Sequence, residues 1–366
     1  MRRIPLATAR LAATARLAAT AGIAATAGLT GAAPVLAATT SRGGGTLNAV
    51  AAVSAADAWA VGTTSGPSPL IMHWNGVSWH RIFYPGPLSG QLSGVAAPSA
   101  YDVWAVGDAD SGTLILHWNG TSWARVPSPG TGLLHAVAAT SARSAWAVGS
   151  TGHGALILHW NGAAWTRMTP PTPPGADLTG VAAASGQNAW AVGSDGGRLL
   201  ILHWDGTRWA PARVPALPGT LSAVAVTPAG NAWAAGVGYH TRRTGCDLAC
   251  PLILHWNGQA WQRVPSANPP SQPRGNWLFA VTATARSAWA AGGTSVAGAD
   301  GGTFILRRGS NWWQQVPAPS PPGGVTLFGI AATSARNAWA VGYTTRHTPF
   351  RAVILRWDGT TWTQEL

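Results

Sequence analysis

The stretch ILHWNGTSW, residues 115–123, contains a histidine, two tryptophans and an Asn-Gly pair, a combination that would suit a ligand site. This stretch is repeated, however. Related stretches begin at Ile71, Ile157, Ile201, Ile253, Ile305 and Ile354. A side chain that is needed once for chemistry is not needed in seven sectors of a molecule. The stretch is therefore predicted to be mainly architectural.

A second recurring piece precedes each copy and most often reads Ala-Trp-Ala-Val-Gly. Its tryptophans are Trp59, Trp104, Trp146, Trp190, Trp233, Trp289 and Trp339. The intervals between them are 45, 42, 44, 43, 56 and 50 residues. Self-similarity at this period predicts a solenoid, a propeller or an array.

Each unit is predicted to form four short strands. In the first unit these are residues 47–52, 58–62, 70–74 and 79–82. No segment shows the 3.6-residue apolar period of a helix over ten residues. Four strands in each of seven units predict an all-β fold, a seven-bladed β-propeller with four antiparallel strands per blade. The repeats begin near residues 47, 92, 134, 178, 221, 278 and 327.

The pattern inside a unit also predicts how blades pack. Trp59 and Val61 share one face of the second strand and Ala58 and Ala60 the other, so a bulky face is expected to meet a small face of the adjacent blade. Asn-Gly or Asp-Gly follows the third strand in six of the seven units and suits a tight hairpin turn.

The repeated histidines are interpreted as packing or hydrogen-bonding residues rather than metal ligands. They hold one repeat position, which becomes arginine in the last two units, and a metal site would not tolerate that change. The residues at this position are His73, His117, His159, His203, His255, Arg307 and Arg356. The same architectural interpretation covers the tryptophans except Trp277 and Trp313, which are taken to fall outside the repeat.

The first 38 residues are predicted to be a signal peptide, followed by a linker at 39–46 and the propeller at 47–366. Four arginines among the first 16 residues precede an uncharged, alanine-rich run, and Val35-Leu36-Ala37 suits a cleavage site. An uncleaved membrane anchor is the alternative interpretation. The mature chain is expected to lack a membrane span and to be secreted or held at the cell surface.

The charge of the chain is strongly positive and comes from arginine. The net charge is +12, and loss of the four N-terminal arginines lowers it to +8. The arginines recur along the repeats without forming one cluster, and export argues further against nucleic acid. The expected partner is a protein or an anionic polysaccharide at the cell envelope. The propeller is expected to be a monomer without a cofactor.

Cys246 and Cys250 are the only cysteines in the chain. Two thiols in an exported protein are expected to form a disulfide. A metal site that adds His240 and Asp247 is the rival, but C-x3-C with one histidine lacks the usual zinc spacing. No metal is therefore expected.

The units resemble the neuraminidase-type, Asp-box-like repeat of bacteria, in the form found in the photosystem II stability and assembly factor family. The matching pieces are Leu134-His-Ala-Val, Ala145-Trp-Ala-Val-Gly and Asn161-Gly-Ala-Ala-Trp165. The repeats also resemble those of secreted actinobacterial proteins. The resemblance covers about residues 47–366 and implies a β-propeller fold.

Function is expected on the face that carries the loops between second and third strands and between blades. These loops vary among units, whereas the other loops are nearly constant, and binding residues concentrate on variable loops. The long fifth loop and the polar seventh loop depart most from the repeat. The candidate ligand-binding residues are Asp108, Asp110, His153, Asp195, Arg198, Tyr239, His240, Arg242, Arg243, Trp277, Asp300, Tyr343, Arg346 and His347.

The favoured hypothesis is an exported, non-catalytic binding or scaffold module, without catalytic residues. The alternative is a carbohydrate-active enzyme of the glycosidase or sialidase type, with carboxylates in the central funnel. A sialidase needs a tyrosine paired with glutamate, and the single glutamate, Glu365, falls on a predicted outer strand. Another glycosidase needs two opposed carboxylates, for which Asp108 or Asp110 could serve with Asp195 or Asp300.

Overall fold

The structure is a computed structural model, and it describes residues 44–366 except Pro87, Ser111, residues 240–248, 268–274 and 295–300, Asn311 and His347. The predicted signal peptide and most of the predicted linker lie outside the described residues. The first strand begins at Gly45, so the last two residues of the predicted linker belong to it.

The strands form seven sheets of four. The first four sheets contain β1 (Gly45–Ser54), β2 (Asp57–Thr64), β3 (Pro69–Trp74), β4 (Trp79–Ile82); β5 (Gln91–Ser99), β6 (Asp102–Ala109), β7 (Gly112–Trp118), β8 (Trp123–Arg125); β9 (Leu133–Ser141), β10 (Ser144–Thr151), β11 (Gly154–Trp160), β12 (Trp165–Met168); β13 (Asp177–Ser185), β14 (Asn188–Asp195), β15 (Arg198–Trp204), β16 (Trp209–Pro211). The last three contain β17 (Gly219–Val226), β18 (Ala232–Tyr239), β19 (Ala249–Trp256), β20 (Trp261–Arg263); β21 (Asn276–Ala283), β22 (Ala288–Thr294), β23 (Thr303–Arg308), β24 (Trp313–Gln315); β25 (Val325–Ser334), β26 (Asn337–Thr344), β27 (Ala352–Trp357), β28 (Trp362–Gln364).

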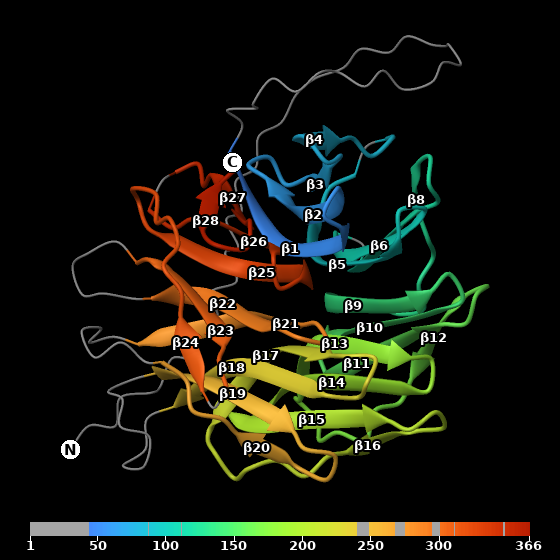
Figure 1. Cartoon of the computed structure of the whole chain (residues 1–366). Coiled ribbons are helices and arrows are strands. Elements are labelled where there is room, and N and C mark those ends of the chain that lie inside the picture. Colours follow the sequence, from blue (N-terminus) through green and yellow to red (C-terminus); the bar gives the residue numbers. More distant parts are fainter. Residues whose placement is uncertain are drawn as a thin grey trace, which may run out of the picture. The chain divides into compact units, whose positions relative to one another are not determined.

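Each sheet consists of four consecutive strands that pair in chain order, and every pairing is antiparallel. The first strand of each sheet packs against the first strands of both neighbouring sheets, and β25 packs against β1. Figure 1 shows the sheets following one another from blue to red, with β25 beside β1. The described residues contain no helix. The predicted seven-bladed β-propeller is therefore confirmed.

Every first strand carries a β-bulge, which the sequence analysis did not predict. In β9, Leu134 pairs with Gly149 and Ala136 with Val148, so His135 is left between two paired residues. The bulge pushes the Leu133 carbonyl oxygen toward Gly149, where a Cβ atom would overlap it. The glycine that ends each Ala-Trp-Ala-Val-Gly piece is thus required by the close approach of two backbones.

Tryptophans fill the space between blades, as the alternation of bulky and small residues predicts. Trp104 is fully buried and packs with Val106 against Ala145 and Ala147 of the next blade. Its ring centroid lies 5.2 Å from that of Trp165, edge to face. Edge-to-face aromatic pairs are favourable in addition to the area that they bury, so the tryptophans largely determine the contact between blades.

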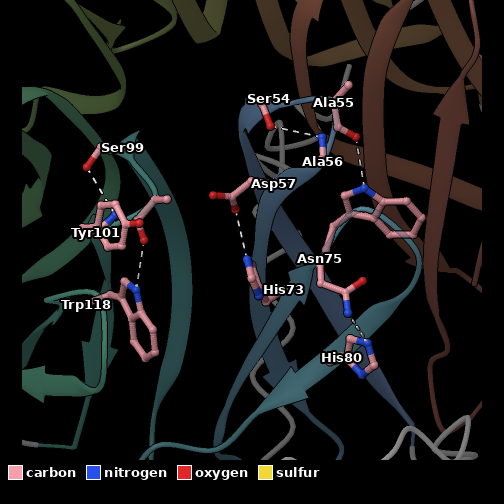
Figure 2. Close-up of polar contacts among 12 residues, drawn as sticks. Ser54, Ala55, Ala56, Asp57, His73, Asn75, His80, Ser99, Tyr101 and Trp118 are labelled. Atoms are coloured by element: carbon pink, nitrogen blue, oxygen red, sulfur yellow. Dashed lines mark hydrogen bonds and ion pairs between the residues drawn. The ribbon is translucent and has the colours of Figure 1, made fainter.

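The repeated histidines pack on these tryptophans. The ring centroids of His73 and Trp59 are 4.1 Å apart and stacked. His73 Nε2 also lies 3.0 Å from Asp57 Oδ1, an interaction drawn in Figure 2. His117 and Trp104 form the same stack. These contacts give the histidine position the packing and hydrogen-bonding role that its repetition predicts.

Arginine replaces histidine in the last two blades without loss of stacking. The guanidinium carbon of Arg356 lies 5.2 Å from the Trp339 ring in its own blade and 5.0 Å from the Trp74 ring in the first blade. A guanidinium over an indole face is attracted by the ring quadrupole. Arg356 therefore bridges the contact between the last and first blades.

Within residues 44–366, as far as the structure describes them, no strand is exchanged between the chain ends, so side-chain packing and a few backbone bonds close the ring. Leu47 and Trp74 of the first blade pack with Trp339 and Ile354 of the seventh. The Gly45 N–H also donates a 2.7 Å hydrogen bond to the Phe350 carbonyl oxygen. Because the first and seventh blades have no chain connection, this contact is the one that holds the circle shut.

The turn between third and fourth strands is longer than the expected tight hairpin. It has four residues, of which the first is asparagine or aspartate in six blades. In the third blade, Asn161 Oδ1 accepts hydrogen bonds from the Ala163 and Ala164 N–H groups at 2.9 and 3.0 Å, and Gly162 has a φ of +96°. The side chain of the first residue thus closes the turn.

The sixth blade corrects the assignment of its tryptophans. Trp313 pairs with Arg308 across the β23–β24 hairpin and is fully buried. Trp313 therefore occupies the repeat position, and Trp312 is the additional residue. The turn of this blade starts at Gly309 and has four residues, as in the other blades, so Trp313 is the first residue of the fourth strand.

Three of the stacked histidines predict a dependence of stability on pH. Burial lowers the pKa values of His159, His203 and His255 below 6.5, with the positive charge of Arg308 contributing at His255. Below that pH the unfolded chain binds more protons than the folded chain, so the free energy of unfolding falls as pH falls. We expect the melting temperature to be lower at pH 5.5 than at pH 7.5.

Differential scanning calorimetry across this pH range would measure the effect. The matched variant is His159→Gln, His203→Gln, His255→Gln, which keeps a planar polar group at each position but cannot titrate. Its melting temperature is expected to vary less over the same range. An equal slope in the two proteins would exclude these histidines as the cause.

Candidate functional site

The variable loops lie at one end of the ring because adjacent strands are antiparallel. We call this end the variable-loop face; its described residues between second and third strands are 65–68, 110, 152–153, 196–197, 301–302, 345–346 and 348–351. The opposite end, the hairpin face, carries the four-residue turns at 75–78, 119–122, 161–164, 205–208, 257–260, 309–312 and 358–361. The innermost strands begin at the variable-loop face, and their bulges lie close to that end.

The bulge residues form a ring of seven side chains near this face. They are Asn48, Ser93, His135, Thr179, Ser222, Phe279 and Phe328. Asn48 Nδ2 donates a 2.8 Å hydrogen bond to the Leu92 carbonyl oxygen of the next blade, and His135 Nε2 lies 3.4 Å from Asp177 Oδ1. The bulge side chains thus reach across to neighbouring blades.

The sixth and seventh blades have phenylalanine in place of the polar bulge residue, and these two phenylalanine rings form the start of an aromatic stack. The ring centroids of Phe279 and Phe328 are 4.9 Å apart. Phe328 stacks on Tyr343 at 4.9 Å with 7° between the planes, and Tyr343 meets Phe350 at 5.3 Å. We call these four residues the aromatic ladder. All four are only partly buried, so part of the surface of each residue remains accessible to solvent.

The ladder is an apolar platform that carries one hydroxyl group, that of Tyr343. Burial raises the pKa of Tyr343 above 10.0, so its hydroxyl is protonated at neutral pH and can donate a hydrogen bond. Arg346 and Arg351 lie in the same loop as Phe350, and both are exposed. Aromatic rings beside guanidinium groups can bind apolar or planar groups together with carboxylates.

The ladder contains one residue that the sequence analysis singled out, Tyr343, and three that it missed. Phe279 and Phe328 fall within strands that were assigned to architecture. An alignment of the seven units would have shown them, because the residue after the first-strand leucine is polar in the first five units and phenylalanine in the last two. Phe350 lies in the seventh variable loop, which the analysis did favour.

The other described candidates are divided among separate blades. Gln91 donates a 2.9 Å hydrogen bond to Asp108, and Ser89 donates a 2.7 Å hydrogen bond to Asp110, so both carboxylates are engaged within the second blade. Trp277 lies half-buried on β21, opposite Gly293. Asp108 and Asp110 thus lie in the second blade, whereas Trp277 shares β21 with the ladder residue Phe279.

A second small group forms where the fourth and fifth blades meet. Arg198 pairs with Pro218 in an isolated bridge, and the Tyr239 N–H donates a 3.0 Å hydrogen bond to the Pro218 carbonyl oxygen. Asp195 pairs with Arg198 across the hairpin of β14 and β15. The structure thus brings Asp195, Arg198 and Tyr239 together, and Tyr239 is 39% exposed.

Several candidates lie outside the described residues: His240, Arg242, Arg243, Cys246, Asp300 and His347. Cys250, which is 3% exposed, is disulfide-bonded. The described part of the chain contains no group of three or more His, Cys, Asp or Glu side chains placed to hold a metal ion. Nor does any helix in that part have the length and apolar character needed to cross a membrane.

Comparison with known proteins supports the fold at low sequence identity. No protein-family model and no curated protein matches the chain. Among solved structures, YCF48 bound to a D1 peptide is similar, with a TM-score of 0.56 and 17% identity, covering 86% of this chain and 93% of that chain. The BP39L lectin from Burkholderia pseudomallei is similar with a TM-score of 0.59 and 16% identity, covering 87% and 98%.

The WD40 propeller domain of Doa1 is also similar, with a TM-score of 0.57 and 10% identity, covering 84% of this chain and 92% of that chain. These similarities agree with the strand topology. The protein is a seven-bladed β-propeller, a scaffold that hosts many functions on its loops. The fold alone does not assign a function, which has to come from the side chains on the loops.

Proposed function

We propose that the protein is an exported, non-catalytic binding module that uses its variable-loop face to bind a protein or an anionic glycan. The observation that carries this proposal is the aromatic ladder. Seven nearly identical blades place polar or small residues at the bulge except where two phenylalanines extend a stack through Tyr343 to Phe350. Half-buried aromatic rings on an otherwise polar face are typical of recognition surfaces.

The charges around the ladder support a ligand with an anionic group. Arg346 and Arg351 belong to the loop that supplies Phe350, whereas Asp108, Asp110 and Asp195 belong to the second and fourth blades. The described part of the face is therefore not uniform: one sector is aromatic and basic, and the second and fourth blades carry these three carboxylates together with Arg198. A ligand that pairs a planar or apolar body with a negative charge fits the first sector.

The two ligand classes correspond to those of similar propellers. YCF48 has been solved with a D1 peptide, and BP39L is a lectin. Both resemble this chain in fold alone. They support the proposal to the extent that a propeller of this kind can present either a peptide site or a sugar site.

Export is part of the proposal and rests on the first 38 residues together with the cysteine chemistry. Arginines followed by an alanine-rich segment have the order of a secretory signal. The disulfide at Cys250 suits an oxidising compartment. The signal-like N-terminal segment and the disulfide both suit a protein that meets its ligand at the cell envelope.

The contacts of the described carboxylates do not favour the glycosidase alternative. Asp108 and Asp110 are hydrogen-bonded to Gln91 and Ser89, and Asp195 lies two blades further along the ring. A hydrolase of this kind needs two carboxyl groups within about 10 Å, on opposite sides of the scissile bond. The binding function has the stronger support.

A repeat-restoring variant tests the proposal with little risk to the fold. Phe279→Ser, Phe328→Thr, Tyr343→Ser gives the sixth and seventh blades residues that Ser222, Thr179 and Ser194 already supply elsewhere. Biolayer interferometry would compare wild type and variant on polygalacturonate, hyaluronan, heparin, neutral dextran and a displayed peptide library. We expect binding to an anionic polysaccharide or to a peptide, weakened at least about tenfold in the variant.

Tyr101→Ser is the matched control, since Tyr101 is 74% exposed at the hairpin face. It should bind as wild type does. Equal binding by the ladder variant, or loss of binding in the control, would contradict the assignment of the site. Absence of binding to every probe would contradict the proposed function.

A further inference from the structure

The sixth blade differs from the others at two neighbouring positions of its hairpin. Arg308 occupies the position held by tryptophan in the other six blades, namely Trp74, Trp118, Trp160, Trp204, Trp256 and Trp357. Trp312 occupies the position before the last tryptophan, where the other blades have Ser78, Ser122, Ala164, Arg208, Ala260 and Thr361. Both changes lie at the hairpin face, away from the aromatic ladder.

The change at Arg308 alters the contact with the fifth blade. Elsewhere the outer tryptophan packs on the inner tryptophan of the preceding blade, as Trp160 does on Trp104 with ring centroids 5.0 Å apart. Here the guanidinium carbon of Arg308 lies 4.9 Å from the Trp233 ring. The side chain fills less of the space, and a pocket of about 260 Å³ opens between the two blades.

The pocket combines aromatic walls with one cation. It is lined by Trp233, His255, Val264, Arg308, Gly309, Ser310, Trp312 and Trp313. Trp312 is 47% exposed at its rim, and His255 stacks on Trp233 with ring centroids 4.1 Å apart. None of the ion pairs among the described residues includes Arg308, so its guanidinium has no carboxylate partner there. Its N–H groups can therefore meet an incoming anion.

His255 does not add a second charge. Burial, helped by the positive charge of Arg308, lowers its pKa, so the imidazole is neutral at neutral pH. The Ser310 side chain, on the exposed part of the turn, contributes a hydroxyl. The site thus offers one guanidinium, one hydroxyl and the exposed indole of Trp312, which is 47% exposed.

We propose that this pocket is a second binding site, for a small organic carboxylate on a single six-membered ring. An apolar cavity of about 150 Å³ holds benzene, whereas sites for drug-sized molecules begin near roughly 300 Å³. A volume of about 260 Å³ therefore suits one ring with its carboxylate. The ring packs on the Trp312 indole and the carboxylate pairs with Arg308. Both aromatic acids and uronic acids have this chemistry.

Saturation-transfer difference NMR on the full chain would test the site. Benzoate and glucuronate are compared with their neutral counterparts, benzyl alcohol and glucose, so that the two sources of carboxylate are distinguished. We expect one of the acids to bind at least about tenfold more tightly than its neutral counterpart, the difference that one charge-assisted hydrogen bond supplies.

Two substitutions of the same residue separate charge from space. Arg308→Gln keeps the pocket open and should abolish the preference for the acid. Arg308→Trp restores the repeat residue and should abolish binding of all four compounds while retaining the fold, which a thermal melt would check. Arg286→Gln, which removes an exposed arginine in another turn of the same blade, should bind as wild type does.

Three outcomes would overturn the proposal. They are undiminished acid binding by Arg308→Trp, equal affinity of acid and neutral compound for the wild type, and absence of binding by the wild type. Because the aromatic ladder is intact in all these variants, the result is independent of the function proposed for the variable-loop face.

Discussion

Gly149→Ala is expected to prevent the propeller from reaching its native state. The Cβ of alanine would overlap the Leu133 carbonyl oxygen, which the bulge at His135 places against β10. Neither backbone can withdraw, because β10 is hydrogen-bonded on its other side to β11. We expect a loss of more than about 4 kcal/mol in the free energy of unfolding, the range of severe backbone strain and overpacking.

Soluble yield, far-ultraviolet circular dichroism and the melting temperature would measure this loss. The control is Gly152→Ala in the adjacent loop, where an added Cβ meets no atom within 4 Å. That variant should be as stable as wild type or slightly more stable, because alanine restricts the unfolded chain. A folded Gly149→Ala protein with an unchanged melting temperature would show that the bulge does not confine this glycine.

Trp339→Ala is expected to destabilise the ring more than the same change inside it. Trp339 is fully buried, and its ring centroid lies 4.9 Å from that of Trp74 and 5.1 Å from that of Trp79 in the first blade. Truncation of a buried tryptophan costs about 3–5 kcal/mol. At this position the two blades also lack a chain connection, so nothing tethers them once the contact is weakened.

Trp146→Ala is a close control, because Trp146 lies 4.9 and 5.1 Å from Trp204 and Trp209. The two deletions remove nearly the same packing, but the third and fourth blades are joined by the chain. Thermal melting and limited proteolysis should show a lower melting temperature and faster cleavage for Trp339→Ala. If Trp146→Ala is equally or more affected, the contact between the first and seventh blades is not the weak point of the ring.

The period of the sequence predicts the fold because each blade repeats one packing solution. The repeat pattern shows three of the residues that matter. They are Trp59 and its equivalents, the glycine that ends the same short piece, and the histidine that stacks on the tryptophan. The pattern does not show the bulges, because they depend on the register between two strands. The four-residue turn was likewise missed, since Asn-Gly alone is compatible with shorter hairpins.

The candidate site was only partly predictable for a related reason. Variable loops point to Tyr343 and Arg346, but Phe279 and Phe328 lie in strands, where an aromatic residue suggests core. Their exposure follows from the bulge, which turns the side chain toward the neighbouring blade. The pocket at Arg308 was hidden in the same way, because a damaged repeat gave no indication that the lost tryptophan leaves a space.

Hydrogen–deuterium exchange with and without the tightest-binding polysaccharide or peptide probe is the most direct test of the account. If the aromatic ladder is the binding site, exchange becomes slower in segments 325–330 and 343–352, which carry Phe328, Tyr343 and Phe350. Protection confined to the hairpin face, or the absence of any protection on a probe that binds, would contradict the assignment of function to the aromatic ladder.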